Sequence, residues 1–165
     1  MSDERNDAAL ERALRRLPRG SGFVFRHYHL PDDERVARWS TLLRIARARG
    51  HIAILADSAL TAREWGADGL YGAPRALYPT RRLVTLATAH SLRELGQANR
   101  VRAAAVLLSP AFETRSHPRA KALGPVRFRL LARHARLPVI ALGGMTARTA
   151  RRLRWPQWAA VDGLS

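Results

Sequence analysis

The sequence contains no cysteine, and Lys121 is its only lysine among 165 residues. The absence of cysteine excludes disulfides, thiolate metal sites and a cysteine nucleophile. No apolar run approaches the ~20 residues that a membrane span requires, and the polar start, Met1 to Asp7 (MSDERND), differs from a secretory signal, which needs an apolar stretch. We therefore expect a soluble, cytoplasmic protein without a membrane partner.

Acidic residues are also scarce, since 13 Asp and Glu stand against 29 Lys and Arg and leave a net charge of +16. Such an excess suggests a polyanionic partner. The arginines, however, are spread through predicted helices instead of being gathered in a tail or a block, so nucleic acid is not expected as the main partner. Trp65, Trp155 and Trp158 are expected to pack in the core and not to stack on bases.

Strand-like and helix-like segments alternate along the chain, which is the pattern of a parallel α/β fold. We expect seven strands, at residues 23–29, 52–57, 69–72, 83–90, 103–109, 139–143 and 158–162. The length suits one domain with a sizeable core. A complete eight-stranded α/β barrel typically has ~250 residues, so the sequence predicts a parallel barrel that is shortened.

Capping signals mark the starts of several helices. Residues 32–49 carry apolar side chains at helical spacing, with acidic residues at the start and Gly50 just past the end. Ser91 to Glu94 (SLRE) is a capping-box pattern directly after a predicted strand. Thr146 can likewise cap a helix that runs to Leu153. Residues 7–17 are expected to form an amphipathic helix, and nothing before them resembles a strand.

Two predicted strands run directly into small, polar or glycine-rich loops. The first continues from Ser109 through SPAFETRSHP, and the second ends in Gly143-Gly144. Backbone N–H groups in such loops, together with the positive end of the following helix, favour a bound anion above the strand ends. Glycines let those amides approach the anion closely. We therefore expect a phosphate site at Gly143 and Gly144.

His90 ends a predicted strand and precedes the capped helix. This position places an imidazole at the mouth of the barrel, where it could transfer protons near neutral pH. The alternative is a strand-end histidine that hydrogen-bonds the backbone. The other five histidines show no spacing typical of metal ligands.

Several of these segments, in the same order, resemble the thiamine-phosphate synthase and TenI-type thiazole tautomerase family. The resemblance covers residues 21–165 and includes the runs 109–118 (SPAFETRSHP) and 137–145 (LPVIALGGM). It implies a TIM-type barrel in residues 21–165, preceded by a helical extension in residues 1–20. The family's first strand and final helix have no counterpart here. The open sheet edge is then covered by the N-terminal helix, by a neighbouring chain in a homodimer, or by nothing.

The resemblance also implies a ligand and its site. The family's thiazole phosphate is bound by the loops after the last two strands, which here match Gly143, Gly144, Asp162 and Gly163. Asp162 would oppose a phosphate unless an arginine such as Arg148 neutralises it. TenI-type tautomerases use a histidine at the position of His90. Further residues at matching substrate-binding positions are Ser109, Thr114 and Ser116, with His117 where the family has lysine.

Synthase chemistry in this family needs pyrophosphate and Mg²⁺, and here the sequence departs from the pattern. Arg26 matches the pyrophosphate-binding arginine, but its polar partners are replaced by Val24 and Tyr28. Asp57 matches a metal-binding aspartate, whereas the second acidic residue is replaced by the run 73–76 (APRA). A single carboxylate supplies few of the oxygen ligands that Mg²⁺ requires. Three functions therefore stay open: a synthase, a tautomerase using His90, and a non-catalytic barrel that binds a phosphate ligand or nucleic acid.

Overall fold

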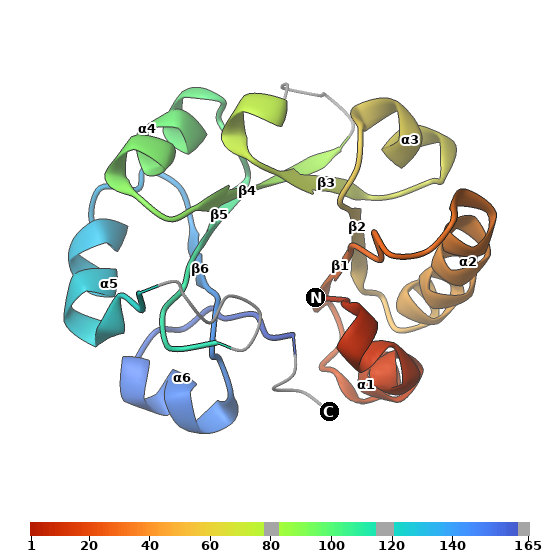
Figure 1. Ribbon diagram of the computed structural model, residues 1–165, viewed down its shortest axis with the longest axis horizontal. Coiled ribbons are helices and arrows are strands. Elements are labelled where there is room, and N and C mark those ends of the chain that lie inside the picture. Colours follow the sequence, from red (N-terminus) through yellow and green to blue (C-terminus); the bar gives the residue numbers. More distant parts are fainter. Residues whose placement is uncertain (78–82, 115–120, 162–165) are drawn as a thin grey trace.

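Parallel strands in chain order form one curved sheet, with helices on its outer face (Figure 1). The computed structural model describes residues 1–77, 83–114 and 121–161. In these residues the sheet has six strands: β1 (Gly22–Phe25), β2 (Ile52–Leu55), β3 (Gly69–Gly72), β4 (Val84–Ala89), β5 (Ala105–Leu108) and β6 (Val139–Ala141). The predicted parallel α/β fold of TIM type is confirmed, as a barrel whose sheet does not close around the axis.

The outer helices lie in the connections between the parallel strands, and α6 follows the last strand, β6. They are α2 (Asp32–Ala48), α3 (Ala59–Glu64), α4 (Leu92–Arg100), α5 (Gly124–Ala132) and α6 (Ala147–Leu153), with a 3-10 turn η2 (Pro74–Ala76). The 3-10 helix η1 (Glu4–Ala9) and α1 (Leu10–Arg16) precede β1. In the part of the chain that the structure describes, no helix combines the length and the apolar character needed to cross a bilayer.

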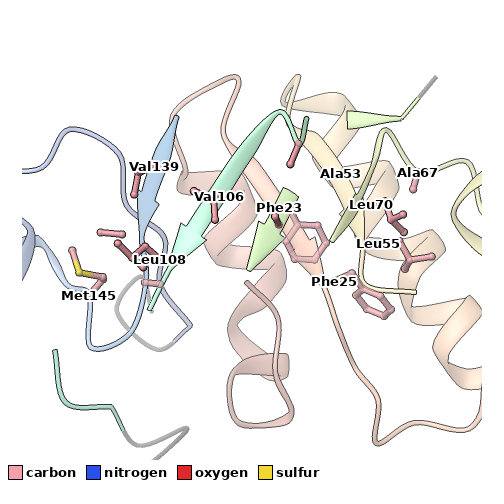
Figure 2. Packing of buried hydrophobic residues seen from close by; sticks show 14 of the residues in the cluster. Phe23, Phe25, Ala53, Leu55, Ala67, Leu70, Val106, Leu108, Val139 and Met145 are labelled. Carbon is pink, nitrogen blue, oxygen red and sulfur yellow. The ribbon is translucent and has the colours of Figure 1, made fainter. Parts of the chain in front are cut away.

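Side chains alternate across the sheet and fill two layers. The larger layer lies between sheet and helices and includes Phe23, Phe25, Leu55, Leu70 and Leu108 (Figure 2). A second cluster lines the barrel interior, and its buried members are Val24, Ile54, Ala56, Leu86, Ala105 and Leu107. The residues that continue this second alternation past the strand ends therefore face the mouth of the barrel.

The first strand is shorter than predicted. It ends at Phe25 instead of His29, because the backbone at His27 adopts a φ of +24°. The His27 side chain is buried, with Nδ1 2.8 Å from Ser2 Oγ and Nε2 2.7 Å from Asp7 Oδ1. Its ring stacks on Phe25 with centroids 4.6 Å apart. These contacts to the N-terminal segment turn the chain away from the sheet.

The predicted seventh strand is reduced to one parallel bridge between Ala141 and Trp158. Ala141 N–H donates to the carbonyl of Gln157, and Ala159 N–H donates to the carbonyl of Ala141, both at 2.9 Å. The end of the predicted strand, Asp162, lies outside the described residues. Residues 157–159 thus extend the sheet beyond β6 by a single pairing.

The first residues of the chain lie between β1 and this last segment. Ser2 N–H donates to the carbonyl of Val24 at 2.8 Å, and the Met1 nitrogen donates to the carbonyl of Ala160 at 2.8 Å. Asn6 Nδ2 donates to the carbonyl of Val161 at 2.7 Å. Among the three alternatives for the open sheet edge, these hydrogen bonds support coverage by the N-terminal segment.

A cavity of about 440 Å³ remains below these contacts, between α1, β1 and the last segment. It is lined mainly by apolar side chains such as Leu10, Leu14 and Ile140, and it reaches Gly22 and Trp158. Gly22 begins β1 and Trp158 lies in the last segment. The cavity therefore lies along the edge between β1 and the last segment.

Candidate functional site

Strand register brings the candidate residues after β4, β5 and β6 to one edge. Ala89 pairs with Leu108, and Leu108 pairs with Ala141. The next row of the sheet therefore contains His90, Ser109 and Leu142, with about 5 Å between neighbouring strands. Gly143 and Gly144 follow directly. Two of the predicted site elements, His90 and the glycine pair, thus lie at the carboxyl ends of β4 and β6, with β5 between them.

His90 is held by the first turn of α4. Its Nδ1 lies 3.1 Å from Glu94 Oε2, and its backbone N–H donates to the same oxygen at 2.5 Å. The Glu94 N–H in turn donates to Ser91 Oγ, which confirms the predicted N-terminal cap. The His90 side chain is 54% exposed, so a ligand at the mouth can reach it. Among the described residues, the partner of the His90 ring is the Glu94 carboxylate.

The Gly143-Gly144 loop packs tightly against the segment that follows β5. Ala111 N–H donates to the carbonyl of Leu142 at 2.7 Å, and Phe112 N–H donates to the carbonyl of Gly143 at 3.0 Å. Both glycines have positive φ, +89° and +62°. A Cβ on Gly143 would lie 2.7 Å from Pro110 Cα. The glycines are therefore required for this close approach, whatever ligand the loop binds.

The helix after this loop begins as the sequence predicts. Thr146 Oγ1 accepts from Thr149 N–H, and Thr149 Oγ1 accepts from Thr146 N–H, so both halves of a capping box are present at the start of α6. Thr149 Oγ1 also donates to the carbonyl of Gly144 at 2.9 Å. These bonds link the loop conformation to the helix start.

The hydroxyl candidates are only partly described. Ser109 is buried at the end of β5, and its N–H donates to the carbonyl of Ala89 at 3.0 Å. Thr114 is half-buried at the end of a described segment. The other residues predicted for this site lie outside the described residues: Ser116, His117, Asp162 and Gly163.

Arg26 is engaged within the chain. Its Nη2 lies 2.7 Å from Asp3 Oδ2, its Nε donates to the carbonyl of Ser2 at 3.1 Å, and its backbone N–H donates to Ser2 Oγ. The candidate pyrophosphate arginine therefore binds the N-terminal segment in this structure. No local pattern indicates this contact, because Asp3 and Arg26 are 23 residues apart.

Asp57 is engaged as well. Its Oδ2 lies 2.5 Å from Arg35 Nη1, and its Oδ1 accepts from Ser58 N–H at 2.6 Å. Burial by itself would raise the pKa of Asp57, but the hydrogen bonds from Arg35, Ser58 and Thr61 outweigh it and hold that pKa below its usual value. The carboxylate is thus ionised and neutralised by a guanidinium.

Mg²⁺ requires several oxygen ligands in octahedral geometry. The described residues contain no group of three His, Asp or Glu side chains that could hold a metal ion. Asp57 is the one carboxylate at the predicted position, and Arg35 already occupies it. The described residues do not fit a Mg²⁺ ion at this position, and no chemical step is assigned to one.

Three comparisons place the chain among known proteins. Residues 1–161 match the family model described as thiamine monophosphate synthase. A protein of Aquifex aeolicus strain VF5, named "Putative thiamine-phosphate synthase 2", is 39% identical over 59 residues. That alignment covers 36% of this chain and only 32% of the relative, so it spans about a third of the relative's length.

Solved structures with the same fold include two thiamine phosphate pyrophosphorylases. A thiamine phosphate pyrophosphorylase from Pyrococcus furiosus superposes with a TM-score of 0.79 at 22% identity, covering 97% of this chain and 82% of that one. One from Bacteroides thetaiotaomicron gives 0.61 at 15% identity, covering 96% and 77%. An aldolase from Escherichia coli K12 gives 0.63 at 10% identity, covering 98% and 71%. At these identities the superpositions establish the barrel fold alone.

Proposed function

Because the chain belongs to the thiamine monophosphate synthase family, we propose that it binds a phosphorylated thiazole at the carboxyl ends of β4 to β6 and moves a proton on that ring. The observation that carries the proposal is the pairing of His90 with Glu94, on the strand edge that also holds the Gly143-Gly144 loop. The ligand and the reaction are those of TenI-type tautomerases, which the sequence resembles.

The contacts of His90 suit a residue that acts first as the general base and then as the general acid. An ionised carboxylate only accepts hydrogen bonds, so the proton of neutral His90 belongs on Nδ1, which faces Glu94. This leaves the Nε2 lone pair to remove a proton from one position of the bound thiazole. The resulting imidazolium, stabilised by Glu94, then returns the proton at a second position of the ring. The reaction is an isomerisation, so no other reactant is consumed.

The phosphate would lie on the loop after β6. Backbone N–H groups at Gly143 and Gly144 can approach an anion because neither residue carries a side chain. Hydroxyls of Ser109 and Thr114 are further candidate donors from the neighbouring strand end. We keep Ser116, Asp162 and Gly163 in the proposed site on the family resemblance, with Arg148 as the candidate cation beside Asp162.

Coupling of the thiazole to an aminopyrimidine pyrophosphate, the synthase reaction, is the second candidate. The family name favours it, and Arg26 and Asp57 stand at the matching positions. In this structure both residues bind partners within the chain, Asp3 and Arg35. Synthase activity with bound Mg²⁺ would require these partners to be displaced. A homodimer that covers more of the β1 edge is a further proposal from the same resemblance. A cytoplasmic location is a further proposal from the polar N-terminal sequence.

The decisive experiment follows one thiazole phosphate tautomer by NMR as it converts to the other. We expect turnover by the wild type and its loss by about 100-fold or more in His90→Asn, because general acid/base catalysis contributes at least that much, with the dissociation constant of the product little changed. His134→Asn, at an exposed position, is the matched control.

Pyrophosphate release from the two thiamine precursors is measured in parallel, with and without Mg²⁺. Magnesium-dependent release that His90→Asn leaves intact would replace the tautomerase proposal with the synthase. Binding of thiazole phosphate with neither reaction would leave the non-catalytic alternative.

A further inference from the structure

Acidic residues are absent from a long stretch of the chain. Between Thr114 and Val161 there are eleven Lys and Arg and no Asp or Glu. Twelve of the 13 acidic residues precede Thr114, where they accompany 18 arginines. The excess positive charge is therefore concentrated in the last third of the sequence, a feature that the number of arginines alone does not reveal.

The described part of this stretch places its cations on one side of the barrel. They lie on α5, on α6 and in the adjoining loops, which are neighbours at the lower left of Figure 1. Arg129 Nη2 donates to the carbonyl of Leu153 at 2.8 Å, and the rings of Phe128 and Trp155 pack edge to face with centroids 5.3 Å apart. We define the basic face as the nine exposed cations of this region: Lys121, Arg127, Arg129, Arg133, Arg136, Arg148, Arg151, Arg152 and Arg154.

The basic face has no carboxylate partner in the described part of the chain. Within residues 1–77, 83–114 and 121–161, none of the nine forms an ion pair, whereas Arg26, Arg35 and Arg38 each pair with a carboxylate. No acidic residue is available within the stretch itself. A surface of this kind attracts anions and loses that attraction with increasing salt.

We infer that the basic face binds the phosphate backbone of duplex nucleic acid, as a second function independent of thiazole binding. Guanidinium groups donate paired hydrogen bonds to phosphate oxygens, and eight of the nine cations are arginines. Binding of single strands relies on exposed aromatic platforms. The aromatic residues of this region, Phe128, Trp155 and Trp158, pack against the core instead.

A bilayer is a less suitable partner than a duplex. Membrane-surface helices bury a broad apolar face. The core-facing side of α5 is already occupied by Phe128 and Ala132, and its exposed side offers only Val126 and Leu130 as large apolar groups. Charge, and not apolar area, is what this surface provides.

The test uses a fluorescein-labelled 20-base-pair DNA duplex of arbitrary sequence and measures anisotropy against salt concentration. A helix of nine residues rises about 13 Å, and with the adjoining loops we expect about four phosphates to be contacted. The plot of log affinity against log salt should then have a slope of about −4, because each neutralised phosphate contributes about −0.9.

The key variant replaces Arg127, Arg133, Arg136 and Arg151 with Gln. The matched control replaces Arg12, Arg15, Arg16 and Arg19, which are exposed on and after α1. Both variants lose four charges. We expect the first to weaken duplex binding at least tenfold and to reduce the slope by two or more, and the second to change either by less than threefold. Circular dichroism and thiazole phosphate binding verify that each variant is folded.

Three results would overturn the inference. Equal losses in the two variants would mean that net charge, and not this face, attracts the duplex. Absence of salt-dependent binding by the wild type would exclude the interaction. Binding to vesicles of anionic phosphatidylserine that depends on the same four arginines, without duplex binding, would assign the face to a membrane instead. Because thiazole binding is measured separately, failure here leaves the proposed function unaffected.

Discussion

The guanidinium of Arg35 and the carboxylate of Asp57 form an ion pair at the carboxyl end of β2, with Nη1 and Oδ2 2.5 Å apart. Arg35 is buried, its Nη2 donates to the carbonyl of Ala56 at 3.2 Å, and its Cζ lies 5.2 Å from the Trp65 ring centroid. A carboxylate at the position of a family metal ligand therefore serves here as the counter-ion of a buried cation.

We predict that Asp57→Asn destabilises the protein by about 2–3 kcal/mol, because it leaves the buried Arg35 charge without its partner. Urea unfolding measures the loss. The double variant Arg35→Met with Asp57→Asn should recover at least half of it, since the buried charge is then absent. A cost below about 0.5 kcal/mol for the single variant, a value typical of exposed pairs, would show that the pair does not contribute in this way.

The buried His27 predicts a pH dependence of stability. Burial lowers the pKa of His27, and the hydrogen bond with Asp7, whose carboxylate is shared with Arg38, only partly opposes that effect. The unfolded chain then takes up the proton first as pH falls below about 6.5. We expect the His27 contribution to the free energy of unfolding to be constant above that pH and to decrease below it. It adds to a decrease that begins below pH 8, because burial lowers the pKa of the Met1 amine to about 5.

The matched variants for this prediction are His27→Gln and His134→Gln. The first should lose the part of the slope between pH 6.5 and 5, while the second, at an exposed position, should retain it. Urea unfolding at half-unit pH steps measures both. An increase in stability as pH falls from 7 to 5.5 would instead mean that protonated His27 is the favoured partner of Asp7.

Two glycine-to-alanine substitutions distinguish a glycine that the backbone conformation requires from one that only lowers the helix propensity. Gly144 has a φ of +62°, and an added Cβ would collide with the carbonyl of Glu113 and lie 2.9 Å from the Cβ of Phe112. We expect Gly144→Ala to cost more than about 2 kcal/mol. Gly96→Ala, in α4 with no atom within 4 Å of the added Cβ, should stabilise by about 0.5–1 kcal/mol. Thermal unfolding of both variants measures the difference, and a Gly144→Ala protein as stable as the wild type would contradict the packing described.

Much of the fold could be predicted from local patterns. Apolar runs and caps act over a few residues, so β3 was expected at the residues where it occurs, and α2 differs by only one residue at its end. Ser91 and Thr146 cap their helices as predicted, but the capping box predicted at Ser91 is only half formed, because Glu94 accepts from the N–H of His90. These signals are local because each depends on neighbours within one turn or one strand.

The contacts that sequence reasoning missed join distant segments. The turn at His27 depends on Ser2 and Asp7, and Arg26 is bound by Asp3. Likewise, the resemblance assigns Asp57 to a metal, whereas its partner Arg35 lies 22 residues away on α2. Charge alone could not reveal Arg35, since the chain has 28 arginines. In the candidate site, His90 and the glycine pair lie at the expected edge, while Glu94 as the partner of the His90 ring was not foreseen.

The most direct test of the central claim is a calorimetric titration of the protein with thiazole phosphate. We predict a saturable, micromolar dissociation constant for the wild type and for Gly96→Asp, and no measurable binding for Gly144→Asp, in which the added side chain collides with the carbonyl of Glu113 and displaces the loop. Mg²⁺ should leave the wild-type affinity unchanged. Binding that survives in Gly144→Asp, or no binding by the wild type, would contradict the assignment of the strand-end loop as a phosphate site.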